Sequence, residues 1–195
     1  MIIGIDNEYI AEDTPGGAVA PDSRPDVMET YCEVMQMGAC RVDQDGTEVA
    51  IINKLVKPHL IHTIPPWLSD MTGITEERRN DEGVHFLQAL EELVQLVGTE
   101  RGWTFSGDNV VLAGNCAAHG VPYPFVQPLL RVKPRLADWG IGIQHYLLRG
   151  YSEMNSGHLH KVLGIELPSI TGVGAHDACH DARSVAHSIH HIYHT

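Results

Sequence analysis

The sequence lacks several features that mark common classes of protein. It contains no run of roughly eighteen apolar residues, so we expect no transmembrane helix. Its 4 cysteines form no Cys-x-x-Cys pair, which is typical of reduced, mostly buried thiols in a cytoplasmic protein. Basic residues are scarce, with 13 Lys and Arg against 25 Asp and Glu, and a net charge of −12. This balance disfavours broad binding of duplex nucleic acid, because such binding depends on neutralising phosphates.

The composition is otherwise that of a globular chain. Of its 195 residues, 43% are hydrophobic and 19% are charged, and this length is sufficient for a substantial core. There is no internal repeat and no linker-like segment, so we expect one domain over residues 1–195. The sequence does not indicate an oligomeric state.

Two carboxylates follow the first apolar run of the chain. Residues 2–5 read as a buried strand that leads into Asp6 and Glu8. Side chains two positions apart on a strand point to the same face, so Asp6 and Glu8 project together. Two like charges this close repel each other, and a bound divalent cation is the usual relief.

The start of the last predicted helix carries a His and, five residues later, an Asp. Apolar residues recur at helical spacing over 182–193, glycines stand just upstream, and Asp177 is a candidate N-cap. His176 would then lie just outside the helix and Asp181 in its first turn, where the helix dipole tolerates an anion. The pair offers a fixed carboxylate for a metal ion and a mobile imidazole for proton transfer.

These segments resemble the DEDDh, or DnaQ-like, 3′–5′ exonucleases. That family begins with Asp-x-Glu, here Asp6 and Glu8, and ends with His-x-x-x-x-Asp, here the segment 176–181. Between them, 56–58 (Val-Lys-Pro) and 68–75 (Leu-Ser-Asp-Met-Thr-Gly-Ile-Thr) resemble a further family segment. The match is closest to the branch that trims the 3′ ends of histone mRNA and small RNAs. The motifs occur in the family's order and span nearly the whole chain.

The resemblance implies a fold and a chemistry. The fold would be the ribonuclease H-like α/β fold, a mixed five-stranded sheet in the order 3-2-1-4-5 flanked by helices. Asp6, Glu8 and Asp181 would bind two Mg²⁺ or Mn²⁺ ions, which prefer such oxygen ligands. His176 would be the general base that activates water. The substrate would be the 3′ end of single-stranded RNA or DNA, and the sequence does not discriminate between the two.

One family motif has no evident match: an Asp that follows a mid-chain strand. We predict that strand at 109–113, and the aligned position falls on Ala118 or, in another alignment, on Gly120. Ala118 would then mark a lost metal ligand, through an engineered or a natural change. Alternatively, His119 or Asp138 replaces the ligand.

Two other functions remain open at this stage. If the ligand is naturally absent, the chain would be a pseudo-nuclease that binds nucleic acid or protein without cutting. The segment 176–180, His-Asp-Ala-Cys-His, also resembles a relaxed zinc-hydrolase helix, with His187 or His190 as the third ligand. That reading ranks lower because it leaves Asp6 and Glu8 unexplained.

The remaining pattern predicts the elements around the site. We expect strands at 1–9, 29–42 and 47–56 with a hairpin turn at 43–46, helices at 84–97 and 182–193, short helical segments from Pro65 and Thr75, and a fifth strand or edge at 136–139. The Pro- and Gly-rich loop 10–27 follows Glu8 and would border the active site, where it could act as a lid.

Overall fold

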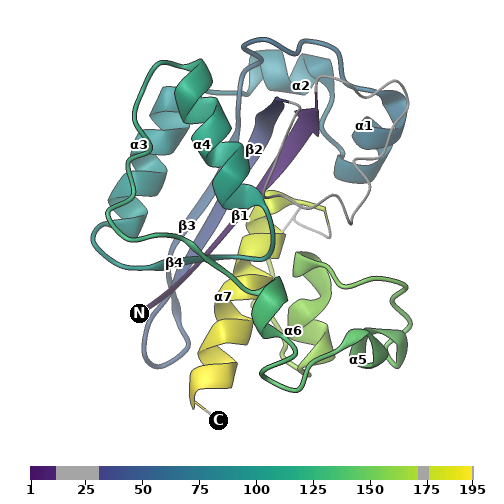
Figure 1. The fold of residues 1–195 in the computed structure, drawn as a ribbon. Coiled ribbons are helices and arrows are strands. Elements are labelled where there is room, and N and C mark those ends of the chain that lie inside the picture. The colour runs from purple at the N-terminus through teal and green to yellow at the C-terminus, as the bar shows by residue number, and fades with distance from the viewer. Residues whose placement is uncertain (12–30, 171–175, 195) are drawn as a thin grey trace.

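The computed structural model describes residues 1–11, 31–170 and 176–194. A twisted sheet runs through the centre, with helices packed on both of its faces (Figure 1). Its strands are β1 (Ile2–Ala11), β2 (Cys32–Val42), β3 (Glu48–Leu55), β4 (Gly102–Thr104) and β5 (Leu130–Arg131). Its α-helices are α1 (Pro66–Thr72), α2 (Glu76–Asp81), α3 (Phe86–Val97), α4 (Asp108–Ala118), α5 (Ile143–Leu147), α6 (Leu159–Val162) and α7 (Ala178–His194). Short 3-10 segments lie at Lys133–Arg135 and Ser156–His158.

The strand order confirms the predicted topology. It is β3-β2-β1-β4-β5, with β1, β2 and β3 antiparallel and with β4 and β5 parallel to β1 and to each other. The predicted turn at 43–46 joins β2 to β3, and the Asp43 carboxylate accepts hydrogen bonds of 2.9 Å from the backbone amides of Asp45 and Thr47. The mixed five-stranded α/β class is therefore confirmed.

Two glycines let the last helix lie directly on the sheet. A Cβ on Gly4 of β1 would come within 2.1 Å of the carbonyl oxygen of Ala182, and one on Gly38 of β2 within 2.1 Å of the carbonyl oxygen of Ala178. Gly38 pairs with Asp6 across the two strands, and Asp6 lies on the same face as Gly4 because it is two residues further along β1. The first turns of α7 are thereby fixed beside Asp6.

The opposite face of the sheet is covered by α3 and α4 (Figure 1). The apolar stripe predicted over 84–97 forms α3, and Phe86, Leu90 and Leu93 are buried in a core shared with Ile3 and Ile5 of β1. The short helical segments predicted from Pro65 and Thr75 are α1 and α2. In the described ranges, no helix is long and apolar enough to cross a membrane.

The prediction of strands in the middle of the chain was wrong. Residues 109–113 belong to α4, and the strand precedes them as the short, buried β4. The fifth strand is β5, while residues 136–139 form turns. The run Val110-Val111-Leu112 is too short for its period to separate a strand from a buried helix. The amide of Asn115, which we had placed after a strand, joins α4 to β2 instead: it donates to the carbonyl of Cys32 at 2.7 Å and accepts from the amide of Val34 at 3.1 Å.

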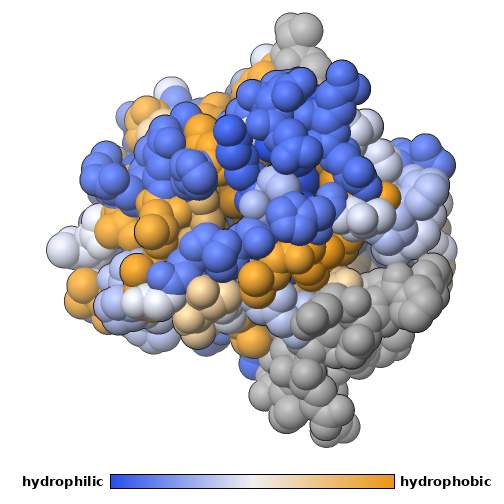
Figure 2. Space-filling view, turned by 90° about the horizontal axis from the view of Figure 1, so that it is seen from above, coloured by the Kyte–Doolittle hydropathy of each residue, from blue (hydrophilic) through white to orange (hydrophobic). Residues whose placement is uncertain are grey.

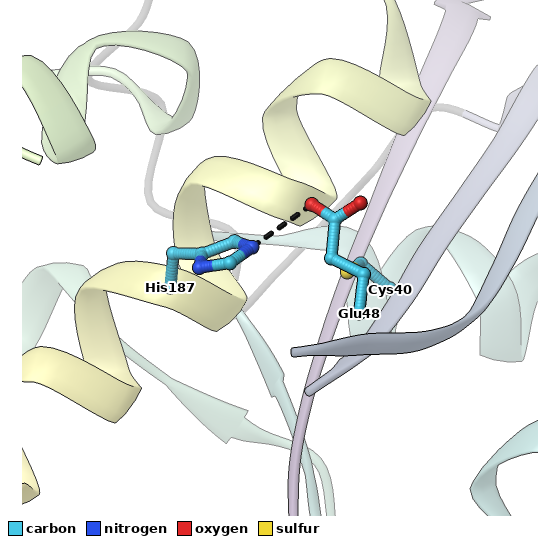
Figure 3. Close-up of side chains that lie close together, drawn as sticks. All are labelled: Cys40, Glu48 and His187. Atoms are coloured by element: carbon cyan, nitrogen blue, oxygen red, sulfur yellow. Dashed lines mark hydrogen bonds and ion pairs between the residues drawn. The ribbon is translucent and has the colours of Figure 1, made fainter. Parts of the chain in front are cut away.

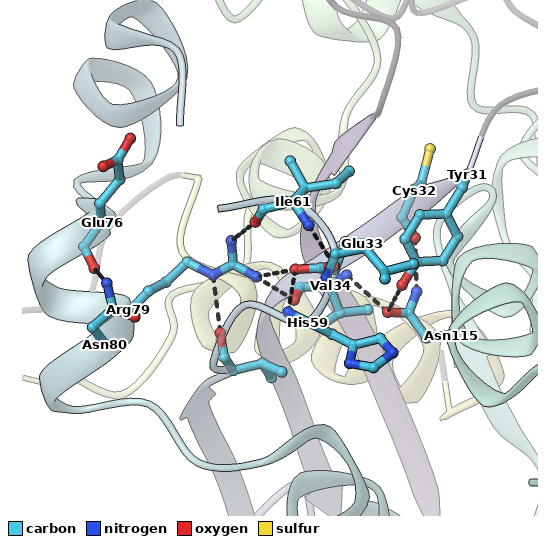
Figure 4. Close-up of polar contacts among 12 residues, drawn as sticks. Tyr31, Cys32, Glu33, Val34, His59, Ile61, Glu76, Arg79, Asn80 and Asn115 are labelled. Atoms are coloured by element: carbon cyan, nitrogen blue, oxygen red, sulfur yellow. Dashed lines mark hydrogen bonds and ion pairs between the residues drawn. The ribbon is translucent and has the colours of Figure 1, made fainter. Parts of the chain in front are cut away.

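A buried ion pair fastens α2 and the segment after β3 to the start of β2 (Figure 4). A guanidinium nitrogen of Arg79 lies 2.7 Å from a carboxylate oxygen of Glu33, and each side chain is almost fully buried. Backbone amides at 59–61 also donate to Glu33, and this lowers its pKa despite its burial. Leu68 of α1 and Ile74 of the connection to α2 pack with Ile10 of β1 in an apolar cluster, which holds these segments beside the end of β1. Most of the predicted loop 10–27 lies outside the described residues.

Candidate active site

Three of the predicted site residues come together. Asp6 and Glu8 of β1 and Asp181 of α7 each offer a carboxylate oxygen, and these oxygens all lie within 4.8 Å of one another. Asp6 and Asp181 are buried and Glu8 is half-buried. A register shift between Glu8 and Tyr9 interrupts the pairing of β1 with β2 immediately after the second carboxylate, and such bulges re-aim side chains beside functional sites. Two distant ends of the chain thus supply one acidic centre.

The segment before α6 holds the Asp181 carboxylate. The hydroxyl of Ser156 donates to Oδ2 at 2.9 Å, and Gly157 leaves room for the other oxygen, because a Cβ there would lie 2.4 Å from Oδ1. Oδ1 itself is buried without a hydrogen-bond partner among the described residues. A buried anionic oxygen in this state is costly, and a cation is the partner that fits it.

A fourth carboxylate, which the sequence analysis does not single out, lies close enough for its charge to raise the pKa of Asp6, Glu8 and Asp181. Asp108 is the first residue of α4 and is buried. Its Oδ1 accepts hydrogen bonds from Asn7, 2.9 Å from the backbone nitrogen and 3.4 Å from the side-chain nitrogen. Asn7 stands between Asp6 and Glu8, so Asp108 is tied to the middle of the acidic strand. The signal in the sequence is a Gly-Asp pair just before the apolar residues that we predicted as the strand 109–113; these residues form the helix α4, which Asp108 begins.

The carboxylates raise one another's pKa. Burial raises the pKa of Asp6 well above its usual range, and the charges of Asp108, Asp181 and Glu8 raise it further. The pKa of Glu8 is raised by burial and then by Asp181, Asp108 and Asp177. Burial raises the pKa of Asp181 to about 7, although its hydrogen bond with Ser156 lowers it. Such mutual repulsion, in a buried site, is the electrostatic state that a divalent cation relieves.

The N-terminus of α7 is capped as predicted. Asp177 Oδ1 accepts from the backbone amides of Cys179 at 3.0 Å and His180 at 3.2 Å. Gln36 of β2 adds a second clamp, since its Nε2 donates to Asp177 Oδ2 at 2.9 Å and its Oε1 accepts from the amide of Ala178 at 3.1 Å. The helix start is therefore fixed to the sheet beside Glu8, which pairs with Gln36.

His176 lies immediately before this cap. It is half-buried and has a φ of 60°, a left-handed conformation that histidine adopts more often than most residues. Its charge contributes to lowering the pKa of His158, after burial and Lys161, so it lies near the segment that holds Asp181. The structure thus places His176 just before α7 begins at Ala178, outside the helix as predicted.

The positions considered for a lost ligand lie elsewhere. Ala118 is exposed in the last turn of α4, and ten residues of helix, about 15 Å, separate it from Asp108. Gly120 is exposed just beyond it. His119 stacks on the rings of His59 and Phe86, at centroid distances of 4.1 and 4.9 Å, and Asp138 is exposed in a turn. The structure brings none of them to the carboxylates.

The zinc-hydrolase arrangement does not form in the described part of the chain. A ring nitrogen of His180 lies 3.3 Å from the carbonyl oxygen of Gly157, and His187 is paired with Glu48. Neither His176 nor His180 belongs to a described group that could hold a metal ion.

A polar cavity of about 410 Å³ lies beside the N-terminal cap of α7. It lies between β2 and β3, the connection from α1 to α2, and the cap of α7, and its lining includes Gln36, Gly73, Arg78 and Asp177. Seen from the side where β1 ends, hydrophilic residues cover much of the surface, with apolar side chains among them (Figure 2). The volume is within the range typical of sites for small ligands.

The fold of the chain matches that of solved exonucleases. The chain has the fold of the DEDDh 3′-exonucleases, as its motifs predicted. It is similar to the nuclease domain of 3'hExo, described as a DEDDh family member bound to rAMP, with a TM-score of 0.69 and 14% identity over 98% of this chain and 90% of that one. It is similar to a 3′-exonuclease that recognises the histone mRNA stem-loop, with a TM-score of 0.72 and 16% identity over 98% and 80%.

More distant nucleases share the same core. E. coli exonuclease I, in complex with a dA16 oligonucleotide, matches with a TM-score of 0.60 and 15% identity over 97% of this chain and 40% of that one. No family model matches the chain, and no curated protein matches its sequence. At identities this low, the similarity to these solved structures shows the fold alone.

Proposed function

We propose that this chain is a metal-dependent 3′–5′ exonuclease that removes nucleotides from single-stranded 3′ ends. The observation that carries the proposal is the meeting of Asp6, Glu8 and Asp181, whose carboxylate oxygens lie within 4.8 Å of one another, with the charge of Asp108 acting on all three. Their shared repulsion and the unpartnered oxygen of Asp181 fit a centre for divalent cations. The likeness to solved exonucleases supports the same reading.

The proposed roles follow from the geometry. Asp6, Glu8, Asp108 and Asp181 would hold two Mg²⁺ or Mn²⁺ ions, which when bound lower the pKa of the attacking water and stabilise the leaving oxygen. His176, outside the rigid helix and half-exposed, would accept the proton from that water. Ser156 and Gln36 position Asp181 and the start of α7 through their hydrogen bonds.

The substrate class rests on the shape and charge of the site. The cavity beside the cap of α7, which Gln36 and Asp177 help to line, has a volume typical of small-ligand sites and would hold one nucleotide rather than a duplex. The net charge of −12 disfavours a long electrostatic contact with duplex backbone. A single-stranded 3′ end, of RNA or DNA, is the substrate that these features favour. The domain would span residues 1–195.

The pseudo-nuclease alternative loses its main support. It depended on a missing carboxylate, and the charge of Asp108 acts on Asp6, Glu8 and Asp181. We therefore propose that Ala118 is an ordinary surface residue and that the chain as it stands is active.

The test uses single-stranded RNA and DNA labelled at the 5′ end, with Mg²⁺ or Mn²⁺. The expected result is shortening from the 3′ end, which a 3′-blocked oligonucleotide resists. Asp6→Asn should be inactive, while Asp70→Asn, at an exposed carboxylate, should match the wild type. Absence of digestion with both metals by the folded protein would contradict the proposal, as would full activity of Asp6→Asn.

A further inference from the structure

A second group of possible metal ligands lies further along α7, away from the acidic centre. Glu48, at the start of β3, reaches the helix, and its Oε1 lies 2.7 Å from Nε of Arg183. The same oxygen lies 2.9 Å from Nε2 of His187 (Figure 3). Cys40 of β2 lies beside them and is fully buried. These residues come from β2, β3 and α7, so they join the hairpin to the helix.

One donor atom from each of Cys40, Glu48 and His187 lies within 4.8 Å of the other two. Ligand atoms around a tetrahedral zinc ion are separated by roughly 3.3–3.8 Å, given zinc bonds of about 2.0–2.3 Å. Shifts of about 1 Å in these side chains would therefore bring them to zinc distances. We propose that Cys40, Glu48 and His187 form a zinc site that clamps α7 to the β2–β3 hairpin.

The donor set decides the metal. A thiolate, an imidazole and a carboxylate together suit zinc, whereas the four carboxylates near Asp6 suit Mg²⁺ or Mn²⁺. The His187 and Glu48 side chains are 9% and 10% exposed, so water can reach the edge of the group and supply a fourth ligand. The site is thus distinct from the acidic centre in its chemistry as well as its place.

The charges around the group are compatible with a cation. Burial raises the pKa of the Cys40 thiol, the Glu48 charge raises it further, and Arg183 lowers it. Zinc binding would therefore release the thiol proton to solvent as the sulfur–zinc bond forms. The Arg183 guanidinium remains partnered, because it also donates to the carbonyl of Pro168. With the thiolate and carboxylate at −2 and Arg183 at +1, a divalent ion leaves only a small net charge.

The other histidines of the helix end have different contacts. His190 lies against Gly46 and its Nε2 is 3.1 Å from the carbonyl oxygen of Gln44, while its ring stacks on that of His194 at 4.2 Å. The abundance of histidine on α7 therefore does not itself define the proposed site. His190 is a useful control because it lies near the same hairpin and is outside the ligand set.

Cobalt(II) serves as the probe, because Co²⁺ bound to a thiolate has a charge-transfer absorption band. Co²⁺ bound only to carboxylates lacks this band. The metal-free protein is titrated with Co²⁺ in excess Mg²⁺, which competes for the acidic centre. We expect one Co²⁺ bound with the thiolate band, loss of the band on adding Zn²⁺, and a rise in melting temperature with Zn²⁺. His187→Gln should weaken binding at least tenfold and Cys40→Ser should abolish the band.

Two controls separate this site from other thiols and histidines. Cys116→Ser removes a buried thiol of another core cluster, and His190→Gln removes a neighbouring imidazole. Both should keep the band. A wild-type protein without a thiolate band overturns the proposal even if Cys40→Ser fails to fold, and so does undiminished binding by His187→Gln.

Discussion

The backbone amide of Asn7 donates a hydrogen bond of 2.9 Å to the carboxylate of Asp108, and this bond joins the acidic strand to the first turn of α4. It brings a residue 101 positions away to the pair formed by Asp6 and Glu8. Because the contact involves a backbone amide of β1, the position of Asp108 depends on the sheet itself. The charge of Asp108 in turn raises the pKa of Asp6, after burial.

Adding one methyl group at Gly4, where α7 packs closely on β1, should destabilise the protein. Gly4→Ala would place a Cβ 2.1 Å from the carbonyl oxygen of Ala182, so we expect a loss of roughly 1–3 kcal/mol or more in the free energy of unfolding. Gly114→Ala is the control: its Cβ meets nothing within 4 Å in α4, and a gain of about 0.5–1 kcal/mol is expected. Urea unfolding of both variants measures this, and equal stabilities would refute the packing argument.

Ser156 should act through Asp181. Ser156→Ala removes a hydrogen bond to a charged group, worth about 1.5–3 kcal/mol, so the cleavage rate should fall roughly 10- to 100-fold. The same bond lowers the pKa of Asp181, so the pH–rate profile should move to higher pH. Ser156→Thr keeps a hydroxyl and should recover part of the rate, while Ser152→Ala, at an exposed position, should change nothing. An unshifted profile in Ser156→Ala would show that the bond has no role in positioning.

Replacing His176 should slow cleavage strongly and should change the affinity for the oligonucleotide little. His176→Ala should slow single-turnover cleavage by about 10²–10⁴-fold, the usual contribution of a general base. Affinity for a single-stranded oligonucleotide, measured with Ca²⁺ in place of the catalytic metal, should hardly change. His62→Ala is a control at an exposed position. Equal losses in affinity and rate would make His176 a substrate contact instead.

The acidic cluster should destabilise the metal-free protein as pH rises. Its carboxylates have raised pKa values in the folded state, so the folded protein holds their protons more tightly than the unfolded chain. For Asp181 the stabilising effect is complete below the unfolded pKa near 4 and is lost as pH rises through about 7, its pKa in the folded protein. The raised pKa values of Asp6 and Glu8 act in the same direction.

Asp6→Asn removes one charge from this cluster. With a chelator present, it should raise the free energy of unfolding at about pH 8, by about 1.4 kcal/mol for each pKa unit of repulsion relieved, and much less at about pH 5. Denaturant unfolding at the two pH values measures the difference. A loss of stability at the higher pH would mean that the Asp6 carboxylate is not under repulsion.

The sequence was most informative where local rules coincide with the fold. Strand alternation placed Asp6 and Glu8 on one face, the cap at Asp177 located the start of α7, and the structure brings Asp181 to both. It was least informative where the chain is short and buried. The strand β4 has three residues, and the apolar residues after Asp108 are compatible with either a strand or a helix. The bond between Asp108 and Asn7 and the side-chain contacts of Asn115 depend on tertiary structure, which no local pattern encodes.

Local sequence patterns also could not predict the proposed zinc ligands. The reading of the sequence grouped histidines along the last helix, whereas the structure selects His187 alone and pairs it with residues of β2 and β3. The partners Cys40 and Glu48 are more than a hundred positions away in the chain, so no spacing rule could connect them to the helix.

We propose that Asp6, Glu8, Asp108 and Asp181 form a complete catalytic centre in the chain as it stands. The most direct test compares Mn²⁺-dependent digestion of a 5′-labelled single strand by the wild type, Asp108→Asn and Ala118→Asp. We expect the wild type to shorten the strand from its 3′ end, Asp108→Asn to lose at least a hundredfold in rate with its fold intact, and Ala118→Asp to match the wild type. An inert wild type that Ala118→Asp makes active would contradict the account, as would full activity of Asp108→Asn.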